Sequence, residues 1–251
     1  MKSNARKRLT AVLISSTTFM LTVASFSPAP AQGFGSAAPS KWQTSLQFLV
    51  GVPQGQFNTN VGNNGYGFSV LAGYAPQASS FIAGVELGYL NYGSQSRFEA
   101  FNPNIPEVRI KVDTDNSILL AHLVLRVQPN AGTLRPYAEG LGGLNYLFTR
   151  SSIQDAGSLN RELASTTNFD DTAWSYGAGG GLMLRVYQKT NGIRRGLQEV
   201  LIDVRARYLI GTEAEYLKKG PIQNQNGVLV YDVQKSETDL LTYQLGATLR
   251  F

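Results

Sequence analysis

The sequence has no cysteine and a single histidine, His122. Without cysteine, the chain forms no disulfide and carries no lipid on an N-terminal cysteine, so hydrogen bonds and packing must hold its fold. Without a second histidine or a cysteine, it offers no metal site of ordinary ligand spacing. We therefore expect neither a metal nor a cofactor.

Charged residues and long apolar runs are also scarce. Charged residues make up 16% of the chain. After residue 31, no segment supplies the roughly 18 continuous apolar residues that a membrane-spanning helix needs. The sequence therefore excludes a helical membrane protein.

The positive charge of the chain is concentrated at its N-terminus. The formal net charge is +5, and four basic residues lie among the first eight: Lys2, Arg6, Lys7 and Arg8. Without them the chain is nearly neutral, so we expect no nucleic-acid partner.

Those basic residues open a segment with the three parts of a secretory signal peptide. An apolar stretch, 9–26, follows them, and Ala29-Pro30-Ala31 has the small residues of a cleavage site. We predict a signal peptide over 1–31 and a mature domain over 32–251. The alternative is an uncleaved anchor, but the polar run 15–18 weakens the apolar core for a spanning helix.

The mature domain shows a recurring alternation of apolar and polar residues, with a period of two. Over 200–210, Val200, Ile202 and Val204 share one face while Asp203 and Arg205 share the other. Alternation of this kind is typical of strands with one apolar face. It marks eight segments: 41–51, 65–75, 80–92, 114–128, 134–149, 172–188, 197–213 and 238–251.

The connections between these segments alternate in length. Those after the second, fourth and sixth segments are short and turn-like, whereas those after the first, third, fifth and seventh are longer or more polar. Short turns at one end and long loops at the other are typical of an outer-membrane β-barrel, as are strands of about 9 to 11 residues.

A soluble β-sandwich is the structural alternative, because it too has seven or eight short strands. The apolar faces here are interrupted by small residues, and aromatic residues gather near the ends of segments, as in membrane-interface girdles. These aromatic residues are Tyr66, Tyr74, Phe81, Tyr89, Tyr92, Tyr146, Phe148, Trp174 and Tyr208. We therefore predict an all-β fold, an eight-stranded antiparallel transmembrane β-barrel with up-and-down topology.

The last segment resembles the assembly signal of bacterial outer-membrane barrels. It alternates to a terminal phenylalanine, with Tyr243, Leu245, Leu249 and Phe251 on one face. Together with 52–57, 84–89 and 135–140, it resembles the small outer-membrane β-barrel family that includes the OmpA transmembrane domain and OmpX, often described as porin-like. The resemblance implies an outer-membrane location, with outer-membrane lipids and the barrel-assembly machinery as partners.

If the apolar face contacts lipid, charged residues of both signs must share the barrel interior. An eight-stranded barrel has room for side chains and little else, so we expect them to pair and fill it. A narrow conduit is the alternative. The expected lumenal polar network is Glu86, His122, Arg126, Glu139, Arg185, Asp203, Arg205, Arg207 and Arg250.

His122 invites a catalytic interpretation, because some small barrels modify lipids. Barrels that deacylate lipid A use a histidine with a serine two positions later, whereas Val124 stands there in this chain. No nucleophile is evident beside a base. We therefore expect no catalysis and place His122 in the polar network.

The long loops are the remaining candidates for function, over 93–113, 150–171 and 214–237, together with the shorter loop after Gly51. Loops on a rigid scaffold commonly carry binding. We predict a structural or surface-interaction protein whose loops meet an unknown surface ligand, with narrow-pore transport and lipid modification as alternatives.

Overall fold

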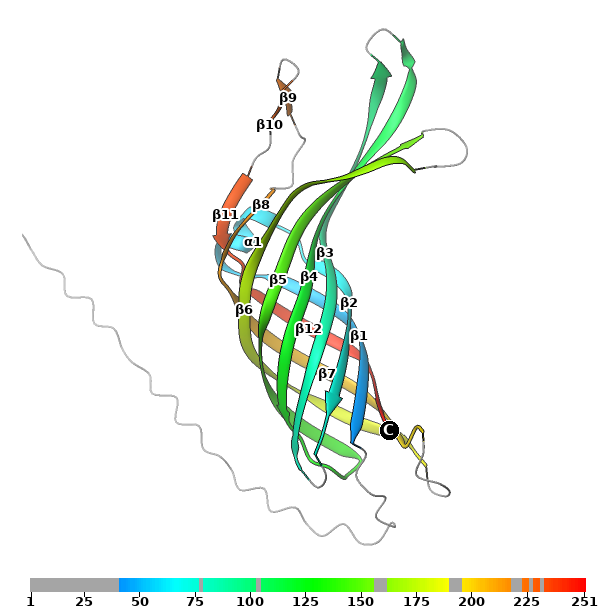
Figure 1. Cartoon of the computed structure of the whole chain (residues 1–251), viewed down its shortest axis with the longest axis vertical. Helices are drawn as coiled ribbons and strands as arrows, with labels where there is room; N and C mark the ends of the chain where they lie inside the picture. The colour runs from blue at the N-terminus through cyan, green and yellow to red at the C-terminus, as the bar shows by residue number, and fades with distance from the viewer. Residues whose placement is uncertain are drawn as a thin grey trace, which may run out of the picture. The chain divides into compact units, whose positions relative to one another are not determined.

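The computed structural model describes residues 41–76, 79–102, 105–155, 162–189, 196–217, 223–225, 228–230 and 233–251. The predicted signal peptide lies outside the described residues. Eight strands close into an antiparallel barrel in the order β1-β12-β7-β6-β5-β4-β3-β2 (Figure 1). They are β1 (Trp42–Pro53), β2 (Gly65–Tyr74), β3 (Phe81–Asn102), β4 (Ile105–Val127), β5 (Leu134–Asp155), β6 (Glu162–Gln188), β7 (Glu199–Gly211) and β12 (Leu240–Arg250).

The first and last strands of the barrel pair with each other and close it. β1 and β12 run antiparallel from Gln43 opposite Arg250 to Pro53 opposite Leu240. Closure pairs both strand edges, which is what a sheet needs in a membrane, where water cannot satisfy backbone groups. The predicted eight-stranded up-and-down barrel is confirmed, and the β-sandwich alternative is wrong.

The side chains of each strand alternate between the interior and the exterior. In β7 every second residue from Glu199 to Gly211 is buried, and those between are not. The exterior carries large exposed apolar side chains on every barrel strand, whereas soluble monomers expose apolar patches of limited size. These side chains include Phe48, Val70, Leu87, Leu123, Leu125, Leu134, Leu182, Val204 and Leu245. This exterior matches a lipid-facing barrel surface.

Glycine allows close approach between neighbouring strands. A Cβ at Gly177 on β6 would collide with the carbonyl oxygen of Tyr208 on β7. Only glycine fits such an approach, and this accounts for one position in the glycine-rich run 177–181.

The barrel has two different ends. Short connections, such as the one at 128–133, join strands at the turn end, where the C-terminus also lies (Figure 1). The opposite end is called the loop end here. At the loop end, two hairpins extend well beyond the barrel. One is formed by β3 and β4, and the other by β5 and β6.

The expectation that 93–113 and 150–171 are loops is therefore wrong for most of their length. β3 continues to Asn102 and β4 begins at Ile105, while β5 continues to Asp155 and β6 begins at Glu162. The segment 214–237 also contains strands: β8 (Glu213–Leu217) pairs with β11 (Val233–Glu237), and β9 (Gln223–Gln225) pairs with β10 (Val228–Val230). The alternation of apolar and polar residues is lost in the sequence of these segments, although the hydrogen-bond ladder continues.

A short helix, α1 (Gly55–Val61), joins β1 to β2 and was not expected from the sequence. Phe57 and Val61, four positions apart, form its buried face, and Gly62 ends it with a left-handed φ of 67°. No described helix has the length and apolar content that a membrane span needs.

The facing of β6 can be tested at Leu182, which is exposed on the barrel exterior. We expect Leu182→Arg to lower the free energy of unfolding by roughly 2 to 4 kcal/mol, because the charge would enter lipid. Leu182→Ala is the control and should cost much less. The measurement is urea unfolding of the barrel in phospholipid vesicles. Equal stability of the two variants would contradict the assigned facing.

Candidate functional site

The described interior of the barrel is arranged in three layers between the turn end and the loop end. The turn end holds a cluster around Glu199, the middle holds an ionic network, and the loop end holds apolar side chains covered by α1. The layers follow from the register, since each inward position of a strand has a fixed height in the barrel.

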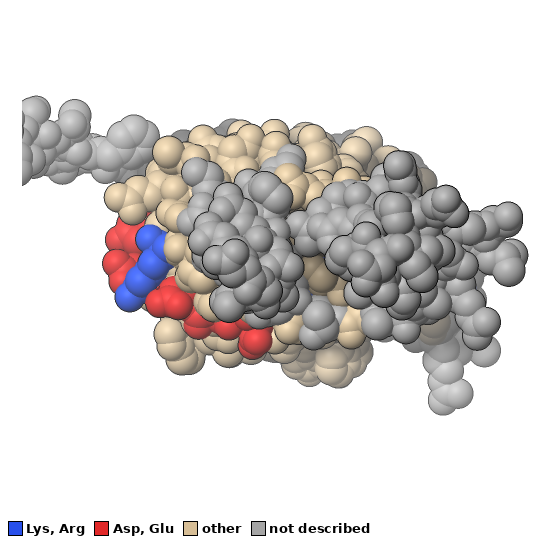
Figure 2. Space-filling model, turned by 90° about the horizontal axis from the view of Figure 1, so that it is seen from above, with Lys and Arg blue, Asp and Glu red and all other residues tan. Residues whose placement is uncertain are grey.

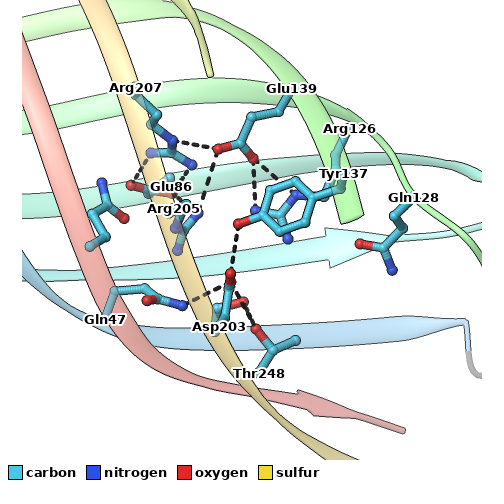
Figure 3. A network of polar contacts seen from close by, with 12 residues as sticks. Gln47, Glu86, Arg126, Gln128, Tyr137, Glu139, Asp203, Arg205, Arg207 and Thr248 are labelled. Carbon is cyan, nitrogen blue, oxygen red and sulfur yellow. Dashed lines mark hydrogen bonds and ion pairs between the residues drawn. The ribbon is translucent and has the colours of Figure 1, made fainter. Parts of the chain in front are cut away.

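The central network joins two carboxylates to three guanidinium groups, all buried (Figure 3). Arg207 binds both carboxylates: its Nη1 lies 2.6 Å from Glu86 Oε1, and its Nε lies 2.6 Å from Glu139 Oε1. Arg205 Nη1 lies 3.2 Å from Glu86 Oε2, and Arg126 Nη2 lies 2.8 Å from Glu139 Oε2. Each charge therefore has a partner of opposite sign on another strand, as burial requires.

Asp203 extends this network toward β1 and β12. It accepts hydrogen bonds from Tyr137 Oη at 2.7 Å, Gln47 Nε2 at 3.0 Å and Thr248 Oγ1 at 3.3 Å (Figure 3). The Arg126 guanidinium stands 4.1 Å above the Tyr137 ring centre, a cation–π distance. With Asp203, three acidic residues face three arginines, so the central network is electrically balanced.

The turn-end cluster surrounds Glu199 with three arginines. Arg135 makes a bidentate pair with Glu199 at 2.9 and 2.7 Å, and Arg250 Nη1 binds the same carboxylate at 3.0 Å. Arg185 is partly exposed and contacts Glu199 at 3.4 Å. Arg135 and Arg250 also donate to the carbonyl oxygens of Gly132 and Asn130, so the cluster fastens the 128–133 turn across this end of the barrel.

An apolar layer fills the barrel near the loop end. We call it the apolar plug; its members are Leu49, Phe57, Val61, Leu90, Tyr92, Ile118, Leu147, Leu209, Tyr216 and Leu240. Phe57 of α1 contacts the rings of Tyr92 at 5.8 Å and Tyr216 at 5.0 Å. Asn60 Nδ2 donates to Tyr216 Oη at 2.8 Å, which holds α1 against β8. The assignment of Tyr92 to an interface girdle is therefore wrong, because its side chain is buried inside.

The residues expected in the lumen are found at two levels. Glu86, Arg126, Glu139, Asp203, Arg205 and Arg207 meet in the central network, whereas Arg185 and Arg250 belong to the turn-end cluster. The predicted lumenal network did not include four further inward residues: Arg135, Glu199, Tyr137 and Gln47. Arg135 and Tyr137 could have been found, because they alternate with outward residues in the same way as Glu139. The apolar plug was not predicted from the sequence. Its signal was the run Ile118-Leu119-Leu120, which places apolar residues on the inward face of the strand as well as on the outward face.

His122 lies inward on β4, directly opposite Glu86 on β3. The sequence did not reveal this cross-strand neighbour, because it depends on the register between β3 and β4. The Glu86 carboxylate is bound by Arg205 and Arg207, and His122 Nε2 has no hydrogen-bond partner among the described residues. No serine or threonine hydroxyl is hydrogen-bonded to it there, so the arrangement lacks an activated nucleophile.

Acidic side chains gather at one edge of the loop end (Figure 2). This acidic edge comprises Asp170, Asp171, Glu213, Glu215, Glu237 and Asp239. Lys235 forms an ion pair with Glu213 at 3.2 Å, and that carboxylate raises the pKa of Lys235. Within the described ranges, no group of three or more such side chains is placed to hold a metal ion.

The closed sheet, the apolar exterior and the filled interior define a transmembrane β-barrel of the eight-stranded class. No family model and no curated protein matches the chain. Similar solved structures include Neisserial surface protein A, at 13% identity, covering 86% of this chain and 100% of that one, with a TM-score of 0.42.

Two further solved structures are similar to this chain. Ail, the attachment invasion locus protein of Yersinia pestis, in complex with the heparin analogue sucrose octasulfate, is 16% identical over 84% of this chain and 97% of that one, with a TM-score of 0.36. A major outer membrane protein from Thermus thermophilus is 11% identical over 84% of this chain and 99% of that one, with a TM-score of 0.33.

The central network can be tested by removing one of its charges. We expect Glu86→Gln to destabilise the barrel by about 3 to 5 kcal/mol, because Arg205 and Arg207 would keep buried charge with one carboxylate fewer. The matched control is Glu213→Gln, whose exposed ion pair with Lys235 should contribute far less. Urea unfolding in vesicles measures both. Equal losses would show that the lumen is solvated and that its charges do not depend on pairing.

Proposed function

We propose that the chain is a bacterial outer-membrane protein that acts without catalysis, by presenting a β-sheet above the membrane to a surface partner. The observation that carries the proposal is the prolongation of strands β3 to β6 beyond the barrel. We call this part the projecting sheet: 93–102 of β3, 105–116 of β4, 149–155 of β5 and 162–174 of β6.

The projecting sheet has an unpaired edge along β3. β3 stays paired with β4 as far as Asn102 opposite Ile105, while its pairing with β2 stops at Asn91 opposite Tyr66. Among the described residues, no strand pairs with β3 on this side beyond that point. An edge with free backbone groups can accept an extended segment of another protein as an added strand.

The opposite edge of the projecting sheet is more covered. β6 ends its pairing with β7 at Ser175 opposite Gly211. Beyond that point the Thr212 N–H donates to the Trp174 carbonyl oxygen, and the Glu215 N–H donates to the Asp171 carboxylate. The acidic edge lies on this side. A partner that approaches β6 therefore meets negative charge, and this favours β3 as the binding edge for an acidic or neutral partner.

The two alternative functions have less support in the described interior. A conduit would have to pass the turn-end cluster, the paired charges of the central network and the apolar plug in sequence. A lipid-modifying site would need a nucleophile beside His122 and access for lipid, whereas His122 faces the closed lumen beside Glu86. Both would require rearrangement of buried, packed side chains.

The last strand is proposed to serve assembly as well as closure. Tyr243 and Leu245 are exposed on the barrel exterior, and the Phe251 backbone donates to the Trp42 carbonyl at 2.9 Å, next to the closing seam. Together with the lipid-facing exterior, this placement supports outer-membrane lipids and the barrel-assembly machinery as partners.

Partner binding should depend on the projecting sheet. Replacing 97–112 with an Asn-Gly turn would join Ser96 to Asp113, which are opposite each other in β3 and β4. We expect this variant to assemble but to lose most attachment of expressing cells to immobilised extracellular-matrix and serum proteins.

His122→Asn is the control for that experiment and should leave both attachment and membrane lipid composition unchanged. Full attachment by the shortened variant would contradict the proposal. A changed lipid A profile that depends on His122 would favour the enzyme alternative instead.

Assembly should depend on the terminal residue. We expect deletion of Phe251 to lower the yield of folded barrel in outer-membrane fractions several-fold, since recognition of the last strand precedes packing. The yield is measured as the band that migrates differently on gels without boiling. The control is Leu134→Ala, which removes an exposed apolar side chain elsewhere. An unchanged yield without Phe251 would contradict the assembly role.

A further inference from the structure

A small open depression lies at the loop end, beside the helix α1. Its volume is about 430 Å³, and it lies where the segment after α1 meets the start of the projecting part of β3. Two glycines and six other residues line it: Asn63, Asn64, Tyr66, Asn91, Tyr92 and Ser94. We call it the notch.

The backbone around the notch is shaped by specific local features. Gly62 adopts a left-handed conformation that ends α1 and turns the chain toward β2. On the facing side, the pairing of β3 with β4 shifts between Asn91 and Gly93, and Asn91 Oδ1 accepts a hydrogen bond from the Gly93 backbone at 3.2 Å. Bulges of this kind commonly redirect side chains next to binding sites.

The walls of the notch are polar but uncharged. Amide groups of three asparagines and the hydroxyl of Ser94 surround it, and no acidic or basic residue lines it. The side chains of Asn64 and Ser94 are exposed and are not held by hydrogen bonds to described protein groups. These groups can both donate and accept hydrogen bonds to a ligand.

Aromatic rings complete the lining of the notch. Tyr92 is buried and is held from beneath by its edge contact with Phe57. Tyr66 is exposed and lines the wall, so it is the aromatic side chain that a ligand can contact. The notch therefore combines one accessible aromatic side chain with neutral hydrogen-bonding groups.

We propose that the notch binds a neutral saccharide. A sugar presents hydroxyl groups that match asparagine amides and a C–H face that packs on an aromatic ring. An anion would find no cation in the lining. An apolar ligand would cover the exposed polar groups of Asn64 and Ser94 without giving them hydrogen-bond partners. Neutral sugars satisfy both features of the lining at once.

The height of the notch on the barrel offers two sources for such a sugar. Tyr66 and Phe68 belong to the exposed aromatic residues of the barrel exterior near the loop end, where the membrane interface lies. The headgroup of a glycolipid in the same membrane could reach the notch, and so could a glycan from outside. The two sources share the chemistry of a neutral sugar.

The test uses the full mature barrel in phospholipid nanodiscs, without sugar-based detergents, which would compete. Methyl glycosides of glucose, galactose and N-acetylglucosamine are titrated and followed by saturation-transfer NMR. We expect saturable binding of at least one of them. Binding of none, or of sucrose octasulfate alone, would overturn the proposal.

The variants compare two equally exposed tyrosines on opposite sides of the barrel. Tyr66 and Tyr176 are each 56% exposed, on β2 and β6, but only Tyr66 lines the notch. Tyr66→Leu should weaken glycoside binding about two- to tenfold, and Tyr66→Leu with Asn64→Ala further still. Tyr176→Leu should leave it unchanged. Equal binding by all these folded variants would overturn the assignment.

A second arm identifies the source of the sugar and separates this proposal from the projecting sheet. If lipopolysaccharide in the nanodiscs suppresses glycoside binding, a glycolipid of the same membrane occupies the notch. If glycoside binding is undiminished, the notch is assigned to an external glycan. The variant lacking 97–112 retains every lining residue, so it should still bind the glycoside even where partner attachment is lost.

Discussion

Backbone hydrogen bonding in a medium without water is the constraint on which this structure depends. Every strand in the membrane must pair on both sides, so β1 must meet β12 and the sheet must close. Closure fixes which side chains face inward. With eight strands the interior is narrow, so those side chains must fill it and satisfy one another.

The interior meets this requirement differently at each level. Balanced charges from β3, β4, β5 and β7 pair in the middle, an arginine cluster holds the 128–133 turn at one end, and α1 covers an apolar plug at the other. Removing one member of a buried charge pair is costly, whereas exposed pairs contribute little. The buried scaffold is therefore closely paired throughout, and this is why we propose that binding belongs to the parts that project from it.

At the loop end, neighbouring strands differ in length and the sheet is no longer closed. Once the strands leave the membrane, the sheet no longer needs to close, and β3 acquires an edge without a neighbouring strand. The same departure of β3 from β2 creates the notch beside α1. The projecting sheet and the notch thus arise from one feature, the unequal length of neighbouring strands.

The sequence by itself determined the barrel and its inside-outside pattern. Alternation in 197–213 and 238–251 gave the facing of β7 and β12, because lipid and lumen impose opposite polarity on successive residues. Only the tertiary structure decided what depends on pairing between distant strands: Glu86 opposite His122, Arg135 with Glu199, and the strands that replaced the expected loops. Strands that leave the lipid need no apolar outward face, so their sequence loses the period-two signal. The long hairpins and the packing of Phe57 against Tyr216 therefore could not be read from the sequence.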